Sequence, residues 1–136
     1  MGSKLRADLM ADGIPVEALE ADVARSYARV TGAPAAIMVC LSMADMDRYP
    51  DARRAHAERM MAVQSVAMAV QNLLLAAHSE GLGACWMCAP LFCPDVVGAA
   101  LNLPADWEAQ ALITLGYPAV TRQSTRHTLE SRVLWR

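Results

Sequence analysis

Two cysteines separated by two residues are the first candidates for chemistry in this sequence. Cys85 and Cys88 belong to a Cys-Trp-Met-Cys segment. Such a pair can act as a redox dithiol when its first cysteine begins a helix, because the helix N-terminus stabilises the thiolate. The surrounding residues instead predict a strand followed by a turn. A thiol redox function is therefore an alternative hypothesis, and simple packing of small side chains beneath a helix is favoured over it.

A zinc site is a second interpretation of the same cysteines. Structural zinc sites need four Cys or His ligands at short spacings. No second Cys-x-x-Cys occurs, and His56, His78 and His127 are scattered singly along the chain. The sequence therefore predicts no metal site.

Gly81 and Gly83 lie just before the cysteine pair. In a dinucleotide-binding loop the glycines follow a strand and open a helix. Here they follow a predicted helix and precede a predicted strand, so the order of elements excludes that class of nucleotide site. Gly81 ends the helix. Small residues at this point would also let main-chain N–H groups approach a planar ligand.

Hydrophobic spacing predicts the elements that must position these residues. Helical spacing indicates helices near residues 5–10, 16–30 and 95–101, and apolar runs indicate strands at 35–41, 84–87 and 107–115. Residues from about 119 onward predict an extended tail that contains several arginines. No internal repeat or domain boundary is visible, so residues 1–136 are interpreted as one domain.

The main predicted element is a helix from Ala52 to Ser79, which contains no Gly or Pro and is rich in Ala. Asp51 is placed to cap its first turn. Because apolar residues occupy most of its circumference, we expect the helix to be buried on nearly all sides. It has the length of a membrane span, but polar side chains such as Gln64 and Gln71 interrupt it, and we predict a core helix and no membrane.

Composition limits the partners of the protein. An apolar content of 55% in 136 residues exceeds what a small core needs and favours a surface hidden in a homodimer. A net charge of −2 with interspersed charges argues against nucleic acid. The first residues lack the apolar run of a signal peptide, so the four cysteines fit reduced thiols and a cytoplasmic location.

Three segments of the sequence together resemble the nitroreductase family of flavoproteins. They are the end of the long helix at 70–77, the glycine segment with its tryptophan at 81–86, and Leu-Gly-Tyr-Pro-Ala at 115–119, and they occur in the family's order. Within the family, segments at 6–13, 49–52 and 103–108 are similar to the flavin-binding C-terminal domain of the F-420 gamma-glutamyl ligases of the FbiB type.

The resemblance implies an α+β fold, with a central antiparallel sheet flanked by helices, and an intertwined homodimer with FMN at its interface. It implies an FMN-dependent oxidoreductase that takes electrons from NAD(P)H or a reduced deazaflavin and passes them to a small-molecule acceptor. The narrower likeness adds a link to the biosynthesis of the deazaflavin coenzyme F-420. The flavin carries the chemistry, so no side chain is expected to be catalytic.

The resemblance also implies which residues surround the cofactor. The strand and turn would lie against the isoalloxazine ring through Trp86, Met87, Cys88 and Ala89. The long helix would wall the same pocket with Met61 and Ser65. In the tail, Arg126 matches a basic residue near the FMN phosphate, and Arg122 is a weaker candidate. An arginine in such a tail can equally be solvated.

One departure from the family pattern concerns the start of the sequence. Family members begin with a segment that carries an Arg-x-Ser-x-Arg phosphate grip, and this sequence begins after the place of that segment. We therefore expect a domain that is incomplete at its N-terminus. The alternative function is a non-catalytic dimer or binding module of the same fold that holds no flavin.

Overall fold

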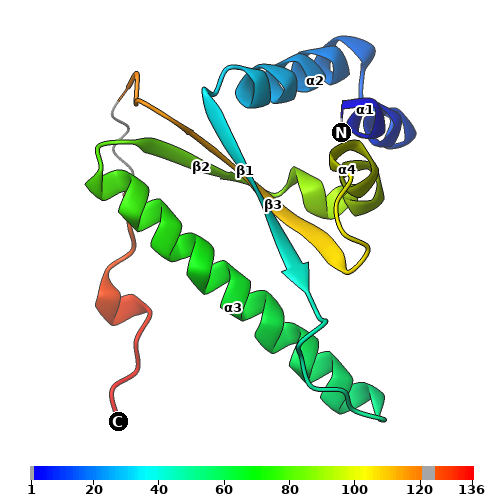
Figure 1. Cartoon of the computed structure of the whole chain (residues 1–136). Helices are drawn as coiled ribbons and strands as arrows, with labels where there is room; N and C mark the ends of the chain where they lie inside the picture. Colours follow the sequence, from blue (N-terminus) through cyan, green and yellow to red (C-terminus); the bar gives the residue numbers. More distant parts are fainter. Residues whose placement is uncertain (1, 121–124) are drawn as a thin grey trace.

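The computed structural model describes residues 2–120 and 125–136 of the chain. In chain order the elements (Figure 1) are α1 (Gly2–Ala11), α2 (Val16–Thr31), β1 (Ala35–Ser42), α3 (Ala52–Ser79), β2 (Gly83–Met87), the 3-10 helix η1 (Ala89–Phe92), α4 (Pro94–Leu101), β3 (Trp107–Gly116) and the 3-10 helix η2 (Leu129–Ser131). Every helix and strand predicted from hydrophobic spacing is present, with small differences at the ends.

The three strands form one antiparallel sheet with β3 in the middle, in the order β1-β3-β2. β1 pairs along its whole length, from Ala35 opposite Leu115 to Ser42 opposite Trp107. β2 pairs with the other edge of β3, from Gly83 opposite Gly116. The predicted α+β class with a central antiparallel sheet and a long helix is confirmed.

A β-bulge interrupts the pairing of β1 with β3. Val39 lies opposite Ala111 and the next residue, Cys40, lies opposite Ala109, so Gln110 is the extra residue on β3. A bulge of this kind changes which residues face each side of the sheet beyond it. Ala109 and Ala111 therefore face opposite sides of the sheet although they are two residues apart.

Helices cover both faces of the sheet (Figure 1), and each face has its own hydrophobic cluster. The cluster beneath α3 centres on Val39, Val70, Ala111 and Ile113. The cluster on the face that carries α4 consists of Cys93, Val97 and Ala109, with Met38 and Leu103 packed against it. β3 contributes to both, with Ala111 and Ile113 in the first cluster and Ala109 in the second.

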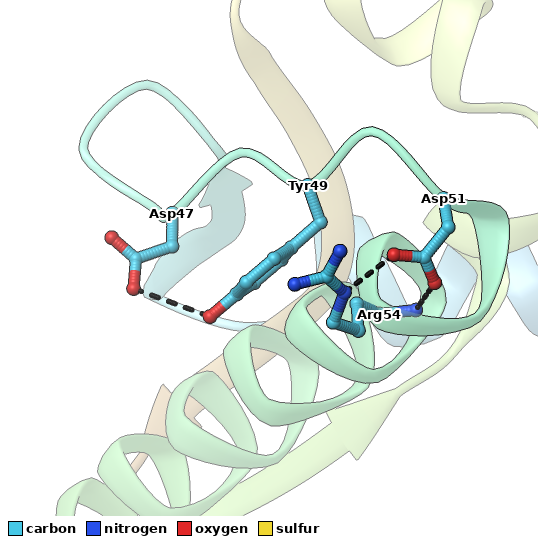
Figure 2. Close-up of polar contacts among 4 residues, drawn as sticks. All are labelled: Asp47, Tyr49, Asp51 and Arg54. Carbon is cyan, nitrogen blue, oxygen red and sulfur yellow. Dashed lines mark hydrogen bonds and ion pairs between the residues drawn. The ribbon is translucent and has the colours of Figure 1, made fainter.

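Local interactions define both ends of α3. At its start the Asp51 side chain accepts a hydrogen bond from the Arg54 N–H at 3.0 Å. A second Asp51 oxygen pairs with the Arg54 guanidinium, which lies 5.0 Å from the centre of the Tyr49 ring (Figure 2). The Arg54 N–H and guanidinium keep the pKa of Asp51 below its ordinary value. At the other end Gly81 has a φ of +73°, so the predicted left-handed glycine stop is confirmed.

The long helix is not buried on nearly all sides within a single chain. Of the 28 residues of α3, four are buried: Glu58, Ala62, Val70 and Ala77. The three-stranded sheet covers one side of the helix, and the apolar side chains on its other sides remain exposed. Among the described residues α3 is also long and apolar enough to cross a membrane by length and composition alone, a test that core helices of soluble proteins also pass.

Candidate functional site

β2 and the turn that follows it form one edge of the sheet, opposite the edge formed by β1. Among the described strands β2 pairs only with β3, so the main-chain groups along its outer edge take no part in the sheet. The turn continues the same edge, with Cys88 at the cap of η1 and Ala89 as its first residue. Outward N–H and C=O groups at an edge strand need partners. A planar ligand with polar ring atoms is one partner that this edge can accommodate.

The side chain of Trp86 is part of the hydrophobic core. It lies opposite Ile113 in the sheet, is half-buried, and packs against the cluster beneath α3. Met87 follows on the opposite face, where it lies beside Leu112. A ligand can therefore meet only the part of the Trp86 indole that the core leaves open.

The two cysteines have different backbone settings. Cys85 lies within β2, and Cys88 precedes a 3-10 helix of four residues. Both are exposed free thiols. The helix-terminus arrangement that activates the first cysteine of a redox dithiol is not found at Cys85. In residues 2–120 and 125–136 no three His, Cys, Asp or Glu side chains gather as metal ligands would.

Ala89 borders a cavity of about 280 Å³ between η1 and the first two helices. Its lining includes Leu5, Leu9, Phe92 and Cys93. Cys93 is buried, and its Sγ lies 3.6 Å from the Ala89 carbonyl oxygen, a contact that steadies the turn. Cys93 could not be singled out from the sequence, because a lone cysteine before a proline carries no distinctive pattern.

Met61 and Ser65 lie on an exposed flank of α3. Met61 is 53% exposed and Ser65 is also exposed. The stripe of α3 that contacts the sheet runs through Ala62, Val66 and Val70, one flank away. Within the described part of one chain these two residues therefore do not close a pocket with the β2 edge.

Polar contacts fix the first half of α3 to the sheet and to the loop before it. The Arg59 guanidinium donates two hydrogen bonds to Glu108 on β3, at 2.7 and 2.8 Å. The Gln110 amide adds a third at 3.0 Å. The Arg59 bonds, reinforced by Gln110, keep the pKa of Glu108 below its ordinary value. The buried Glu58 accepts the Asp47 N–H at 3.3 Å. Sequence reasoning missed these contacts.

The predicted phosphate-binding arginines fall in the tail. Arg126 is exposed, and its guanidinium donates to the Thr125 carbonyl oxygen at 3.4 Å. Arg122 lies outside the described residues. The described part of the tail carries Arg126, Arg132 and Arg136, and the role of Arg126 at a phosphate stays a prediction.

Comparison with known proteins identifies the family of this chain. A model described as the nitroreductase family matches residues 4–117. The chain belongs to the nitroreductase family.

Individual relatives agree with this assignment over parts of their length. A 54-residue stretch is 43% identical to the 5,6-dimethylbenzimidazole synthase of Rhodospirillum rubrum, covering 40% of this chain and 25% of that protein. A Desulfovibrio desulfuricans nitroreductase solved in complex with FMN is 31% identical, with a TM-score of 0.61 over 79% of this chain and 57% of that one. An NADH dehydrogenase/NAD(P)H nitroreductase of Bacteroides thetaiotaomicron is 28% identical, with a TM-score of 0.60 over 99% of this chain and 67% of that one.

These matches confirm a nitroreductase-like fold. The chain spans one quarter of the length of the synthase and 57% of the length of the FMN-bound structure. The narrower likeness to F-420 gamma-glutamyl ligases is not among these findings and stays a prediction.

Proposed function

We propose that this chain forms the ring-binding part of an FMN-dependent oxidoreductase. The observation that carries the proposal is the place of β2 and its turn, at the edge of the sheet, in a chain of the nitroreductase family. The likeness to a nitroreductase solved with FMN supports the choice of cofactor. Bound FMN would supply two-electron transfer between a donor and an acceptor.

The residues of this chain would orient the ring and exclude water from one of its sides. Main-chain N–H groups from Trp86 to Ala89 would face the polar ring atoms, and the small Ala89 side chain leaves room for close approach. Met87 and the open part of Trp86 would contribute apolar surface. Cys88 would contribute contact without acting as a nucleophile, since no step of flavin chemistry requires one.

The arginines of the tail would hold the FMN phosphate. Side chains of α3 would form the apolar wall of the pocket. Arg126, with Arg122 as the weaker candidate, would pair with the phosphate through charge-assisted hydrogen bonds. Met61 and Ser65 face away from the sheet of their own chain, so they can wall the pocket only where a second chain closes the space. We therefore propose that the active form is a homodimer.

The name of one relative supports our choice of electron donor, whereas the acceptor is proposed from the family resemblance alone. NAD(P)H is the donor we propose, since the Bacteroides relative carries that cofactor in its name; reduced deazaflavin is the alternative donor, in keeping with a link to F-420 biosynthesis. The acceptor is proposed to be a small molecule such as a nitroaromatic, quinone or enone.

The test is a titration of the purified chain with FMN and, in parallel, with riboflavin, followed by quenching of flavin fluorescence. FMN should bind more tightly than riboflavin, because riboflavin lacks the phosphate. Arg126→Ala should weaken FMN binding roughly tenfold, the value of one charge-assisted hydrogen bond, and should leave riboflavin binding unchanged.

Arg25→Ala, which removes an exposed arginine on α2, is the matched control and should bind both flavins as the unmodified chain does. If neither flavin binds, the proposed function is wrong and the binding-module alternative takes its place. Equal loss of both flavins in Arg126→Ala would instead remove Arg126 from the phosphate site.

A further inference from the structure

The cavity of about 280 Å³ that Ala89 borders lies between α1, α2 and η1, and we call it the α1 cavity. Its lining combines apolar and charged side chains. Leu5, Leu9 and Phe92 are the large apolar ones, and Lys4, Asp8 and Asp12 are the charged ones. A volume close to the lower end of the usual range for ligand pockets suits a molecule with a single ring.

Two sets of contacts hold the walls of the α1 cavity in place. Arg6 on α1 donates two hydrogen bonds to Glu20 on α2, at 2.8 and 2.6 Å, and joins the two helices. On the opposite wall the buried Cys93 contacts the Ala89 carbonyl oxygen through its Sγ atom at 3.6 Å. The helical wall and the η1 wall are therefore anchored separately.

Phe92 gives the α1 cavity an aromatic surface. It is the only phenylalanine in the sequence, and its side chain on η1 is 74% exposed. Burial of a phenylalanine ring is favourable, so this ring offers a ligand contact area that the fold does not use. Aromatic rings pack against other rings and attract cations over their faces. The apolar part of the lining therefore favours a ligand that carries a ring and accepts a positive charge close to it.

The charged side chains of the lining indicate the charge of the ligand. Lys4 pairs with Asp8 along α1, so these two charges largely neutralise each other. Asp12 is exposed and takes part in no ion pair within the described part of the chain. Ser26 on α2 adds a hydroxyl oxygen that can accept a hydrogen bond from an ammonium group. A cation is therefore attracted to the polar side of the cavity, whereas a carboxylate would be repelled by Asp12.

We propose that the α1 cavity binds a small amphipathic cation, a molecule with one ring and a primary ammonium group on a short chain. Its ring would lie against Leu5, Leu9 and Phe92, and its ammonium group would pair with Asp12. Among the described lining residues only Ala89 also belongs to the segment 86–89 that we propose to face the flavin. An effect of the bound cation on flavin rests on the proposed function, whereas the binding itself does not involve flavin.

The test compound is 2-phenylethylamine, which is protonated at neutral pH, and 2-phenylethanol is its uncharged match. Each is titrated into the flavin-free chain while NMR follows the methyl resonances of Leu5 and Leu9. These resonances should shift to saturation, and those of the buried Leu41, which is not part of the lining, should stay constant. The amine should bind about two- to fivefold more tightly than the alcohol, the value of one exposed ion pair. Equal affinities, or tighter binding of 3-phenylpropanoate, would overturn the proposal.

Three variants test the assigned contacts. Asp12→Asn should abolish the preference for the amine and leave the affinity for 2-phenylethanol unchanged, because only the charge is lost. Asp45→Asn, at an exposed aspartate outside the cavity, is the matched control and should keep the preference. Phe92→Ala should weaken both compounds by a similar factor, roughly fivefold, through the lost apolar contact. A preference for the amine that survives Asp12→Asn would refute the site, provided that circular dichroism shows an unchanged fold.

Addition of FMN distinguishes the α1 cavity from the proposed flavin site. The amine should still bind when the chain is saturated with FMN, because the two sites share only Ala89. Strict competition between the two would assign the cavity to the flavin and refute a separate cation site. A chain that binds the amine as expected but binds no FMN would refute the proposed function and support the cation site.

Discussion

Gly116 at the end of β3 lies directly against Pro34, the residue before β1. A β-carbon added at Gly116 would come within 2.8 Å of the Pro34 Cδ atom, closer than non-bonded carbons can approach. The strand β3 can pass the start of β1 at this point only because residue 116 has no side chain. This contact joins two segments that are far apart in the sequence.

Gly116→Ala is therefore expected to destabilise the fold by about 1–3 kcal/mol, the usual cost of forcing extra volume into a packed site. Gly98→Ala is the matched control. Gly98 lies inside α4, and a β-carbon there would meet nothing within 4 Å. Since alanine favours a helix over glycine, this variant should gain about 0.5–1 kcal/mol. Urea denaturation of both variants measures the difference, and equal effects would contradict the prediction.

Acidification should weaken the link between α3 and β3. The pKa of Glu108 is lower in the folded chain because Arg59 donates two hydrogen bonds to its carboxylate. The unfolded chain therefore binds the proton more readily, and this contribution to the free energy of unfolding is present above the ordinary pKa of about 4.3 and lost as pH falls through the folded pKa. We expect stability to decline with acid below about pH 4.3.

Glu108→Gln should remove part of that decline and should cost up to about 1 kcal/mol at pH 7, since the pair is partly exposed. Urea denaturation at several pH values provides the measurement. Glu17→Gln, at an exposed position of α2, should keep the acid dependence of the unmodified chain. A Glu108→Gln variant with an unchanged acid dependence would show that this pair does not link pH to stability.

Removal of the cap at Asp51 should shorten α3 at its start. Asp51→Ala loses the acceptor for the Arg54 N–H, and the expected cost is about 1 kcal/mol. Asp51→Asn keeps an oxygen at the cap but loses the ion pair with Arg54, so its cost should be smaller. Thermal unfolding followed by circular dichroism ranks the variants. Equal costs of the two variants would mean that the ion pair outweighs the cap.

Trp86 should contribute to stability without any cofactor. Because its half-buried ring packs on the cluster beneath α3, Trp86→Ala is expected to cost about 2 kcal/mol in flavin-free protein, less than a fully buried ring. Trp86→Phe keeps most of the contact and should lose less. If flavin-free stability is unchanged in Trp86→Ala, the ring serves ligand contact alone.

The positions of the elements follow from signals that are local in the sequence. Asp51 and Gly81 mark the two ends of α3 because a cap and a left-handed glycine act within a few residues. Apolar runs likewise identify β1 and β3. The same signals do not reveal which apolar stripe of α3 its own sheet covers, and for that reason the sequence overestimates the burial of the helix.

Local sequence signals predict only part of the candidate site. The segment from Trp86 to Ala89 could be recognised as a family motif, but its position at a sheet edge depends on strand order, which hydrophobic spacing does not specify. The pairing of Arg59 with Glu108 joins residues 49 positions apart. No local pattern encodes it. The proposed role of Met61 and Ser65 likewise depends on a second chain, which the sequence of one chain does not display.

Because of the bulge in β3, a side chain's distance along the sequence no longer tells which face of the sheet it lies on. If the bulge were lost while Gln110 stayed in the strand, strict alternation from Ala111 would direct Glu108 away from α3. Loss of Gln110 together with the bulge would leave Glu108 still facing Arg59. This strand should therefore tolerate a one-residue deletion at position 110, whereas a deletion at 112 or 113 would reverse every side chain between the gap and the end of the strand.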